Sequence, residues 1–575
     1  MHLSYLDIGI IIAYLILSLL IGLYYTRQAE KSTEDYFLGG RKISWWLAGT
    51  SMVATTFAAD TPLLITELVA NQGISGNWVW WNGLIGGMVA TFFFAKLWHK
   101  ANILTDVELT ETRYSGKPAM FLRGFKAIYL GVLMNGIIIA WVNVALGAIL
   151  TVFLEIPSEH LLYYYALAML LVVVYTSLSG LTGVTVTDAV QFVIAMGGCI
   201  ILAYLVVSSP KIGGLSGLAQ KIPAESLQFF PSLSWSETAG SLGKNITLGF
   251  ATFLSFVAVQ WWASWYPGAE PGGGGYIAQR MMSTPKPQDA LKATLLFQFA
   301  HHALRPWAWI LVGLSSLILY PELSVQDKKL GYVMAMKEFL PDGLKGLLLV
   351  AFLAAYMSTI ATQFNWGCSY VINDFYQRFV APKATEKQLI SASRVATFIL
   401  MGISLLITSY IGTLEDAFKF MIKASAGLGG VLILRWYWWR INAWSEITAT
   451  ITPIIVMGIL TQFKIPEPYP LFIITCITTF AWILVTYLTT PTAFETLALF
   501  CKKVQPTGFW QPIYTKLGEK QPDGNFGTLF FGVFSGIFFI YGFLFFLGAV
   551  LLGQTWWVYA IVCILGFLGL RKTLK

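Results

Sequence analysis

The sequence predicts an all-α membrane protein that crosses the bilayer many times and contains an inverted repeat. Of its 575 residues, 56% are hydrophobic and only 11% are charged, and the mean hydropathy is +0.67. Soluble cores could not bury this much apolar surface, so most of the chain must lie in lipid. The second and seventh apolar segments are each broken by residues that disfavour a helix. Because they lie five segments apart, they face opposite ways across the membrane, as matching parts of an inverted repeat do.

About fifteen apolar segments are long enough to cross a bilayer as helices. They cover residues 5–25, 45–69, 78–98, 125–154, 161–178, 187–207, 248–266, 291–320, 344–376, 389–411, 417–439, 447–461, 470–489, 529–552 and 556–570. We expect a transport core that is flanked by further helices. The expected divisions are an N-terminal helix and loop at 1–42, a core at 43–440 with repeats at about 43–210 and 245–440, and additional C-terminal helices at 441–575.

Positively charged residues predict the orientation of the chain. If the N-terminus lies outside, most of the 37 Lys and Arg residues fall in inner loops, among them Arg41, Lys100 and Arg280. An odd number of segments then places the C-terminus in the cytoplasm. We expect a multi-pass protein of a bacterial-type inner membrane. This bias explains the net charge of +8, and no basic patch interleaved with aromatic residues indicates nucleic-acid binding.

Several motifs are missing from the sequence, and their absence argues against some kinds of transporter. The five cysteines have no CxxC spacing, which predicts neither a metal site nor a disulfide framework. No GxxxxGK[ST] motif is present, so an ATP-driven pump is not predicted, and we expect no cofactor. The first segment lacks a basic flank and a cleavage site, so we expect a retained helix. An ion gradient supplies about 2.3 kcal/mol per charge for each 100 mV, which makes it the expected energy source.

The two broken segments predict where the ion and the solute bind. The first break is Asp60-Thr61-Pro62, and the second comprises Pro267-Gly268 and the run from Pro271 to Gly275, which follows apolar residues 250–266. Unwound backbone survives at membrane depth only where protein or a water-filled cavity satisfies its polar groups. Paired breaks therefore indicate a site near the middle of the membrane.

Hydroxyl groups in the ninth segment suit a bare cation. Ala355, Ser358, Thr359 and Thr362 recur at helical spacing and share one face. Small residues of this kind can also serve close helix packing or bond to their own helix. The nearby break at Asp60 favours the cation, since freed carbonyl groups complete an oxygen-only shell.

Few ionisable residues lie within the apolar segments. Asp188 begins the sixth segment, where it either meets a cation or caps the helix. His302, Arg305 and Lys423 carry or can carry positive charge in the eighth and eleventh segments. Their alternatives are snorkelling to the membrane surface and a structural ion pair with an acid such as Asp60.

Four motifs occur in a fixed order along the chain. They are DYFLGGRKISWWLAGTSMVATTFAAD after the first segment, YTSLSGLTGVTVTDAVQ before the sixth, YIAQRMMS after the seventh, and the hydroxyl pattern of the ninth. With these motifs the chain resembles, over residues 5 to about 440, the sodium:solute symporter family, which includes bacterial sodium/galactose, sodium/proline and sodium/sialic acid symporters.

The resemblance implies a LeuT-type core of five plus five helices, formed by segments two to six and seven to eleven. It also implies a sodium site with two carbonyls from the first core helix and one carbonyl and two hydroxyls from the eighth. In this chain those positions are Ala54, Phe57, Ala355, Ser358 and Thr359.

Some relatives hold a second sodium, and this chain keeps only part of that site. The corresponding positions are Asp188, Ser358 and Thr362, while Ala361 offers no side-chain oxygen. We therefore expect one tightly bound sodium.

The solute pocket implied by the resemblance differs from that of the sugar carriers. Trp80 stands where those relatives have an acid, and His302 where they have a lysine, so a galactose-like pocket is not supported. The candidate pocket residues are Asp60, Thr61, Trp80, Trp265, Tyr266, His302, Arg305 and Lys423.

Together these features predict a sodium-coupled symporter of a small organic solute that works by alternating access. The expected partners are the solute, sodium as the only metal ion, and the lipid bilayer. The alternatives are a transport-like sensor or channel, although the chain ends about five residues after its last segment, and a membrane-embedded enzyme, which would need a cluster of catalytic groups. We expect no enzyme activity. Two solute classes remain open, a carboxylate-bearing molecule and a neutral sugar or polyol.

Overall fold

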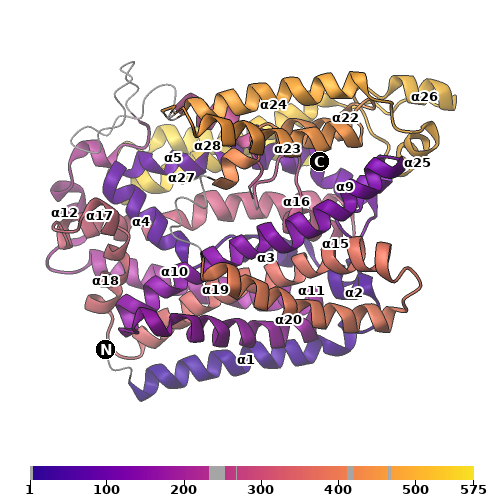
Figure 1. The fold of residues 1–575 in the computed structure, drawn as a ribbon. Helices are drawn as coiled ribbons and strands as arrows, with labels where there is room; N and C mark the ends of the chain where they lie inside the picture. Colours follow the sequence, from indigo (N-terminus) through magenta and orange to yellow (C-terminus); the bar gives the residue numbers. More distant parts are fainter. Residues whose placement is uncertain are drawn as a thin grey trace.

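The computed structural model describes residues 4–231, 253–266, 268–410, 420–463, 465–466 and 468–574, and this part of the chain is helical. Long helices lie side by side in one bundle, with α1 (Tyr5–Ala29) along one edge and α24 (Tyr469–Leu488) along the opposite edge (Figure 1). The described residues contain no β-strand, only an isolated bridge between Trp438 and Phe509. The predicted all-α class is confirmed.

The bundle combines long helices with many short ones. In the first half of the chain the other helices are α2 (Thr33–Leu38), α3 (Trp45–Thr55), α4 (Asp60–Gln72), α5 (Trp78–Trp81), α6 (Gly83–Val89), α7 (Ala95–Ala101), α8 (Leu109–Arg113), α9 (Gly116–Ile128), α10 (Asn135–Leu154), α11 (Leu161–Val207) and α12 (Gly214–Lys221). In the second half they are α14 (Trp261–Ala263), α15 (Gly275–Ser283), α16 (Pro287–Phe299), α17 (Pro306–Leu319), α18 (Leu330–Phe339), α19 (Leu344–Ser369), α20 (Glu386–Thr408), α22 (Leu428–Tyr437), α23 (Ala443–Leu460), α25 (Phe494–Val504), α26 (Gln511–Leu517), α27 (Phe526–Leu551) and α28 (Trp557–Leu574).

Five short stretches are wound as π-helix, in which the backbone hydrogen bonds span one more residue than in an α-helix. They are Ala90–Phe94, Tyr129–Met134, Ser255–Gln260, Ala300–Leu304 and Tyr370–Val380. Such segments are frequent at functional sites, and one of them here contains His301 and His302.

Eleven helices among the described residues are long and apolar enough to cross a membrane, and a twelfth span results if the bent pair α3 and α4 counts as one. One of the eleven, Ser158–Val207, has 50 residues and is therefore about 75 Å long, which exceeds twice the thickness of the hydrocarbon core. It contains two predicted segments. They are separated by a kink at Gly180, whose φ of 56° and closeness to the Tyr36 carbonyl, 2.7 Å from an added Cβ, require glycine.

The remaining predicted segments also have helical counterparts. The seventh begins outside the described residues, at 248–252, and is helical from residue 253 to Ala263. The eleventh likewise begins outside them, at 417–419, and continues into the short apolar helix α22. These two segments are too short or too interrupted to be recognised as spans by length alone.

The first break lies at residues 56–59, just before the predicted tripeptide Asp60-Thr61-Pro62. Helix α3 ends at Thr55, α4 begins at Asp60, and the two axes are bent by 61°. Proline lacks an N–H group, but the first turn of a helix needs none. Pro62 therefore lies in the first turn of α4, and the unwound residues precede it.

The second break lies between α14 and α15. The described residues from Ser264 to Gly274 are not helical, while Pro267 lies outside the described part. Gly272 and Gly273 have φ angles of 79° and 71°, which few other residues adopt. The glycine run thus allows a path that leads directly into α15.

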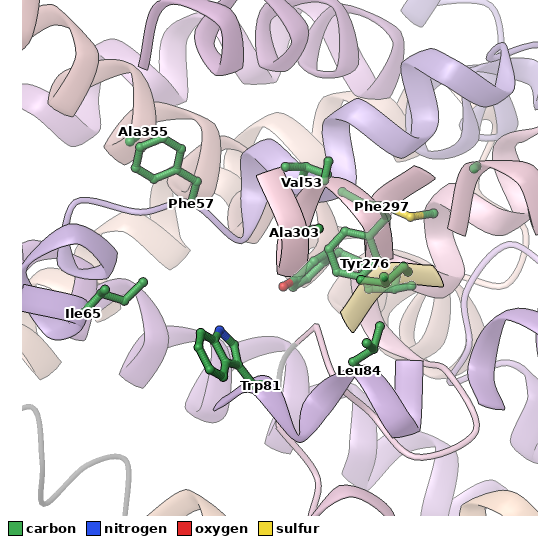
Figure 2. Packing of buried hydrophobic residues seen from close by; sticks show 14 of the residues in the cluster. Val53, Phe57, Ile65, Trp81, Leu84, Tyr276, Phe297, Ala303 and Ala355 are labelled. Carbon is green, nitrogen blue, oxygen red and sulfur yellow. The ribbon is translucent and has the colours of Figure 1, made fainter. Parts of the chain in front are cut away.

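The two breaks lie inside the bundle, where several helices meet. Helix α3 packs against α11, α15, α16 and α19, and α4 packs against α17 and α18. Val53, Phe57, Trp81, Tyr276 and Ala355 belong to one buried apolar cluster around this region (Figure 2). Outside it, α23 packs against α9, α22 and α24, and α27 packs against α6 and α28.

Candidate ion and solute site

The five predicted sodium ligands gather where α19 meets the end of α3. The Thr359 hydroxyl donates to the Thr55 carbonyl at 2.9 Å and to the Ala355 carbonyl at 3.2 Å. The Phe57 amide donates to the Ala54 carbonyl at 3.0 Å as the helix ends. All the candidate ligand atoms for the ion are oxygens, and such a set suits a hard cation such as sodium.

Ser358 connects this group of residues to Asp188 on α11. Its hydroxyl donates to Asp188 Oδ1 at 2.8 Å, and the Ser51 hydroxyl donates to Oδ2. Asp188 is fully buried. The acid that the sequence marks at the start of the sixth segment therefore contacts both α3 and α19.

Arg280 lies among the residues of the second candidate sodium site. Its guanidinium is 3.7 Å from Asp188 Oδ2 and donates to Thr362 Oγ1 at 2.7 Å and to Ser51 Oγ at 3.2 Å. Arg280 is 0% exposed. The positive charge of the arginine thus already faces the Asp188 carboxylate.

The charge pattern of the sequence predicts an inner-loop position for Arg280 and indicates no role for it at this site. The available signal was its position in the YIAQRMMS motif, directly after a broken segment. Only the packing of α15 against α3 and α19 brings it to Asp188, which lies 92 positions earlier.

Arg305 is buried against the first break. It is 1% exposed, and its guanidinium donates to the Val53 carbonyl and to Thr56 Oγ1, both at 3.2 Å. His301 Nδ1 bonds to the same guanidinium and lies 2.9 Å from Thr56 Oγ1. Thr56 and His301 were not among the predicted pocket residues, although a histidine within an apolar segment is a signal that could have marked His301.

The predicted residues Trp80 and His302 contact each other. Their rings are stacked with centroids 5.8 Å apart and planes at 20°, and the Trp80 ring is also 5.7 Å from that of His301. His302 Nδ1 lies 3.2 Å from the Gln298 carbonyl. An aromatic and imidazole wall therefore stands next to Arg305.

The other predicted pocket residues lie on two sides of the breaks. Asp60 is half-buried at the start of α4, with Thr61 Oγ1 3.4 Å from its carboxylate and Arg305 near enough for its charge to act on the acid. Tyr266 packs against two small apolar clusters that contain Ile422 and Met421. Lys423, half-buried beside them, is not among the described residues that line the cavities discussed next.

Two adjoining cavities begin at Trp265. They share the lining residues Tyr129, Leu130, Trp265, Leu428 and Thr450. The first continues to Ser425, whose hydroxyl accepts from the Trp265 amide at 2.9 Å. The second continues to charged residues, which are Asp106, Lys126, Glu270 and Arg435.

Comparison with known proteins identifies the family. The model of the sodium:solute symporter family matches residues 36–452. The chain is 25% identical to a sodium/glucose cotransporter of Vibrio parahaemolyticus, over 79% of this chain and 84% of that protein. It is also 25% identical to the sodium/sialic acid symporter of Proteus mirabilis, over 79% of this chain and 89% of the relative.

A solved structure has the same fold. It is a sodium-coupled sialic acid symporter in a substrate-bound, outward-open state, with a TM-score of 0.66 and 19% identity. The match covers 85% of this chain and 99% of the other. The predicted LeuT-type inverted-repeat architecture is confirmed, and the matched proteins are transporters and not enzymes. The chain belongs to the sodium:solute symporter family and is a sodium-coupled symporter that moves a small organic solute by alternating access.

Proposed function

We propose that the protein couples one sodium ion per cycle to the transport of a solute that bears a carboxylate or another acidic group. The observation that carries the solute assignment is the buried Arg305 beside the first break. A neutral sugar or polyol is the second candidate, favoured by the stacked Trp80 and His302 rings.

The proposed sodium ligands are the carbonyls of Ala54, Phe57 and Ala355 and the hydroxyls of Ser358 and Thr359. Support comes from the position of the Thr359 hydroxyl, which already bridges the two helices that would hold the ion. Because an oxygen-only shell prefers a hard cation, the donor set suits sodium.

A second tightly bound sodium is not part of the proposal. Arg280 places a positive charge beside Asp188 and uses the Thr362 hydroxyl as an acceptor. Ala361 supplies no oxygen from its side chain. A second cation at Asp188, Ser358 and Thr362 would therefore meet both repulsion and a shortage of ligands.

An acidic solute would compensate the positive charge of Arg305. The ion pairs found among the described residues do not include this arginine, although the nearby Asp60 carboxylate offsets part of its charge. A cation at membrane depth is costly unless an anion or polar groups compensate it, and a guanidinium can bind a carboxylate with two parallel hydrogen bonds. The Proteus relative is named for an acidic sugar and the Vibrio relative for a neutral one, so both classes belong in the test.

The location and orientation of the protein are also part of the proposal. We assign it to a bacterial-type inner membrane, with the N-terminus outside and the C-terminus in the cytoplasm, because that orientation puts most Lys and Arg residues inside. The transport core would span 43–440, with the helices after residue 440 added to it.

The test is uptake of radiolabelled solutes by proteoliposomes. The panel should pair sugar acids and other carboxylates with neutral sugars and polyols, each with and without an inward sodium gradient. We expect acidic solutes to be transported, and Arg305→Gln to raise their KM by about tenfold or more, the loss of one charged hydrogen-bonding group. Arg394→Gln, which alters a partly exposed arginine paired with Glu30, is the matched control. Good transport of a neutral polyol with an unaltered KM in Arg305→Gln would overturn the solute assignment.

A further inference from the structure

The second cavity carries two carboxylates on one wall. Asp106 and Glu270 both line it, together with Gly273 and Gly274 of the glycine run. Lys126 and Arg435 line it as well. None of these residues belongs to the sodium or solute site proposed above.

The Glu270 carboxylate is buried but only partly bonded. It is 5% exposed, and its Oε2 accepts a hydrogen bond from the Gly268 amide at 3.1 Å. Its Oε1 has no hydrogen-bond partner among the described residues. A buried carboxylate oxygen that is left without a donor is unfavourable, so this atom needs a positive or hydrogen-bonding group from the cavity.

Asp106 adds a second negative charge close to Glu270. One of its oxygens accepts from the Tyr370 hydroxyl, and the other accepts from the Gly275 amide at 2.9 Å. The basic residues that line the cavity balance this pair only in part, because Lys126 and Arg435 are both bonded to Glu446. With Glu446 counted, the group of five side chains has one excess negative charge.

The glycine run keeps space between the two carboxylates. A Cβ added to Gly274 would lie 3.5 Å from Asp106 Oδ2 and 3.3 Å from Glu270 Cβ. One added to Gly275 would lie 2.5 Å from Glu270 Oε1. A side chain at Gly274 would therefore contact both acids, and one at Gly275 would crowd the unbonded Oε1 of Glu270.

We propose that Asp106 and Glu270 form a cation site, distinct from the sodium site at α3 and α19, which takes a monovalent cation or an ammonium group. Because the surrounding group of side chains has one excess negative charge, a singly charged group would neutralise it. This proposal depends on the proposed function only for the source of the cation. The source is either sodium that leaves the first site or an amino group of the solute.

Its position fits a step on the transport path. The cavity runs from Trp265 at the second break to the loop that contains Asp106. By the distribution of positive charge, this loop faces the cytoplasm. A cation released from the middle of the membrane would meet this site before it reaches the inner solution.

The test measures cation binding in the purified full-length protein. The Thr359→Ala background is used to weaken the first sodium site, and ionic strength is kept constant with tetraethylammonium chloride, a bulky cation that has no N–H group to donate. The probes are ²²Na⁺ and radiolabelled methylammonium, measured at equilibrium. Glu270→Gln removes the charge and keeps the shape, while Gly274→Ala fills the space and keeps both charges. The matched controls are Glu159→Gln, at an exposed position, and Gly197→Ala, where an added Cβ meets nothing within 4 Å.

The proposal predicts saturable binding of one probe per chain, weakened at least about tenfold by Glu270→Gln and Gly274→Ala but not by the controls. Binding of sodium would identify the coupling ion as the source, and binding of methylammonium alone would identify an amino group. The proposal is overturned if neither probe binds, or if Glu270→Gln binds as tightly as Glu159→Gln. Sodium-driven uptake by the unmodified protein is a separate measurement, so failure of the proposed function would be recognised independently.

Discussion

At the scale of single residues, the hydroxyl groups of α19 are the part of the proposed sodium site that mutation can remove. Ser358→Ala and Thr359→Ala each delete one ligand oxygen, whereas the carbonyls of α3 remain. We expect both variants to raise the sodium concentration for half-maximal uptake, by about tenfold for one lost ligand. Uptake against sodium concentration in proteoliposomes measures this value. Ser409→Ala, at an exposed hydroxyl, is the control, and an unchanged sodium dependence in both variants would refute the assignment.

A substitution at Asp188 tests how many sodium ions are transported per cycle. With Arg280 beside it, the carboxylate would act by accepting hydrogen bonds that hold α11 against α3 and α19. Asp188→Asn should therefore lower the transport rate without changing the Hill slope for sodium. A slope near two in the unmodified protein that falls toward one in the variant would instead reveal a second site.

The sequence could predict a group of site residues only where all of them lie on one helical segment. The spacing of Ala355, Ser358 and Thr359 on one helix face is local, so it was visible. The placement of Arg280 beside Asp188 depends on how α15 packs against α3. No spacing along the chain encodes such a contact.

At the scale of elements, α8 is held to two longer helical segments by one acid. Glu111 accepts from Arg123 on α9 and from Arg378 in the π-helical segment that follows α19, both at 2.8 Å. Partial burial alone would raise the pKa of Glu111, but the hydrogen bonds from Arg378 and Arg123 outweigh it and lower the pKa. The acid therefore stabilises the folded protein above the pKa it has when unfolded, and this contribution is lost as the pH falls through the lowered folded value.

Glu111→Gln should consequently lower the apparent Tm at neutral pH, by about 2 °C. The difference from the unmodified protein should shrink as the pH is lowered, since protonation removes the same charge. Thermal unfolding at several pH values measures it, with Glu322→Gln at an exposed position as a control. A difference that grows toward acid pH would contradict this account.

The helical segments were predictable because each shows its own apolar run, while their exact ends were not. Pro62 suggests a break at its own position, yet the first turn of α4 accommodates it and the unwound residues fall at 56–59. Gly180 divides a helix that hydropathy had already separated into two segments. The first break is thus shifted by a local rule of helix starts, whereas the conformation of Gly180 is fixed by its contact with the Tyr36 carbonyl, far along the chain.

At the scale of the whole molecule, a buried charge cluster joins α23 to two helices that precede it in the chain. Glu446 on α23 bonds to Lys126 on α9 and to Arg435 on α22. The inverted repeat could be inferred from the two breaks, because their separation fixes opposite orientations. The packing of α23 could not be inferred in this way. Glu446, Lys126 and Arg435 lie on different segments, and no sequence pattern indicates that these residues meet.

The central claim is that a sodium gradient drives this protein to concentrate its solute. The most direct measurement is accumulation of a radiolabelled solute from the panel in proteoliposomes of the purified chain. With sodium outside only, the internal concentration should rise above the external one and fall back when the gradient is dissipated, while Thr359→Ala should need more sodium to do the same. Accumulation that is equal with and without sodium, or uptake that never exceeds the external concentration, would contradict the account.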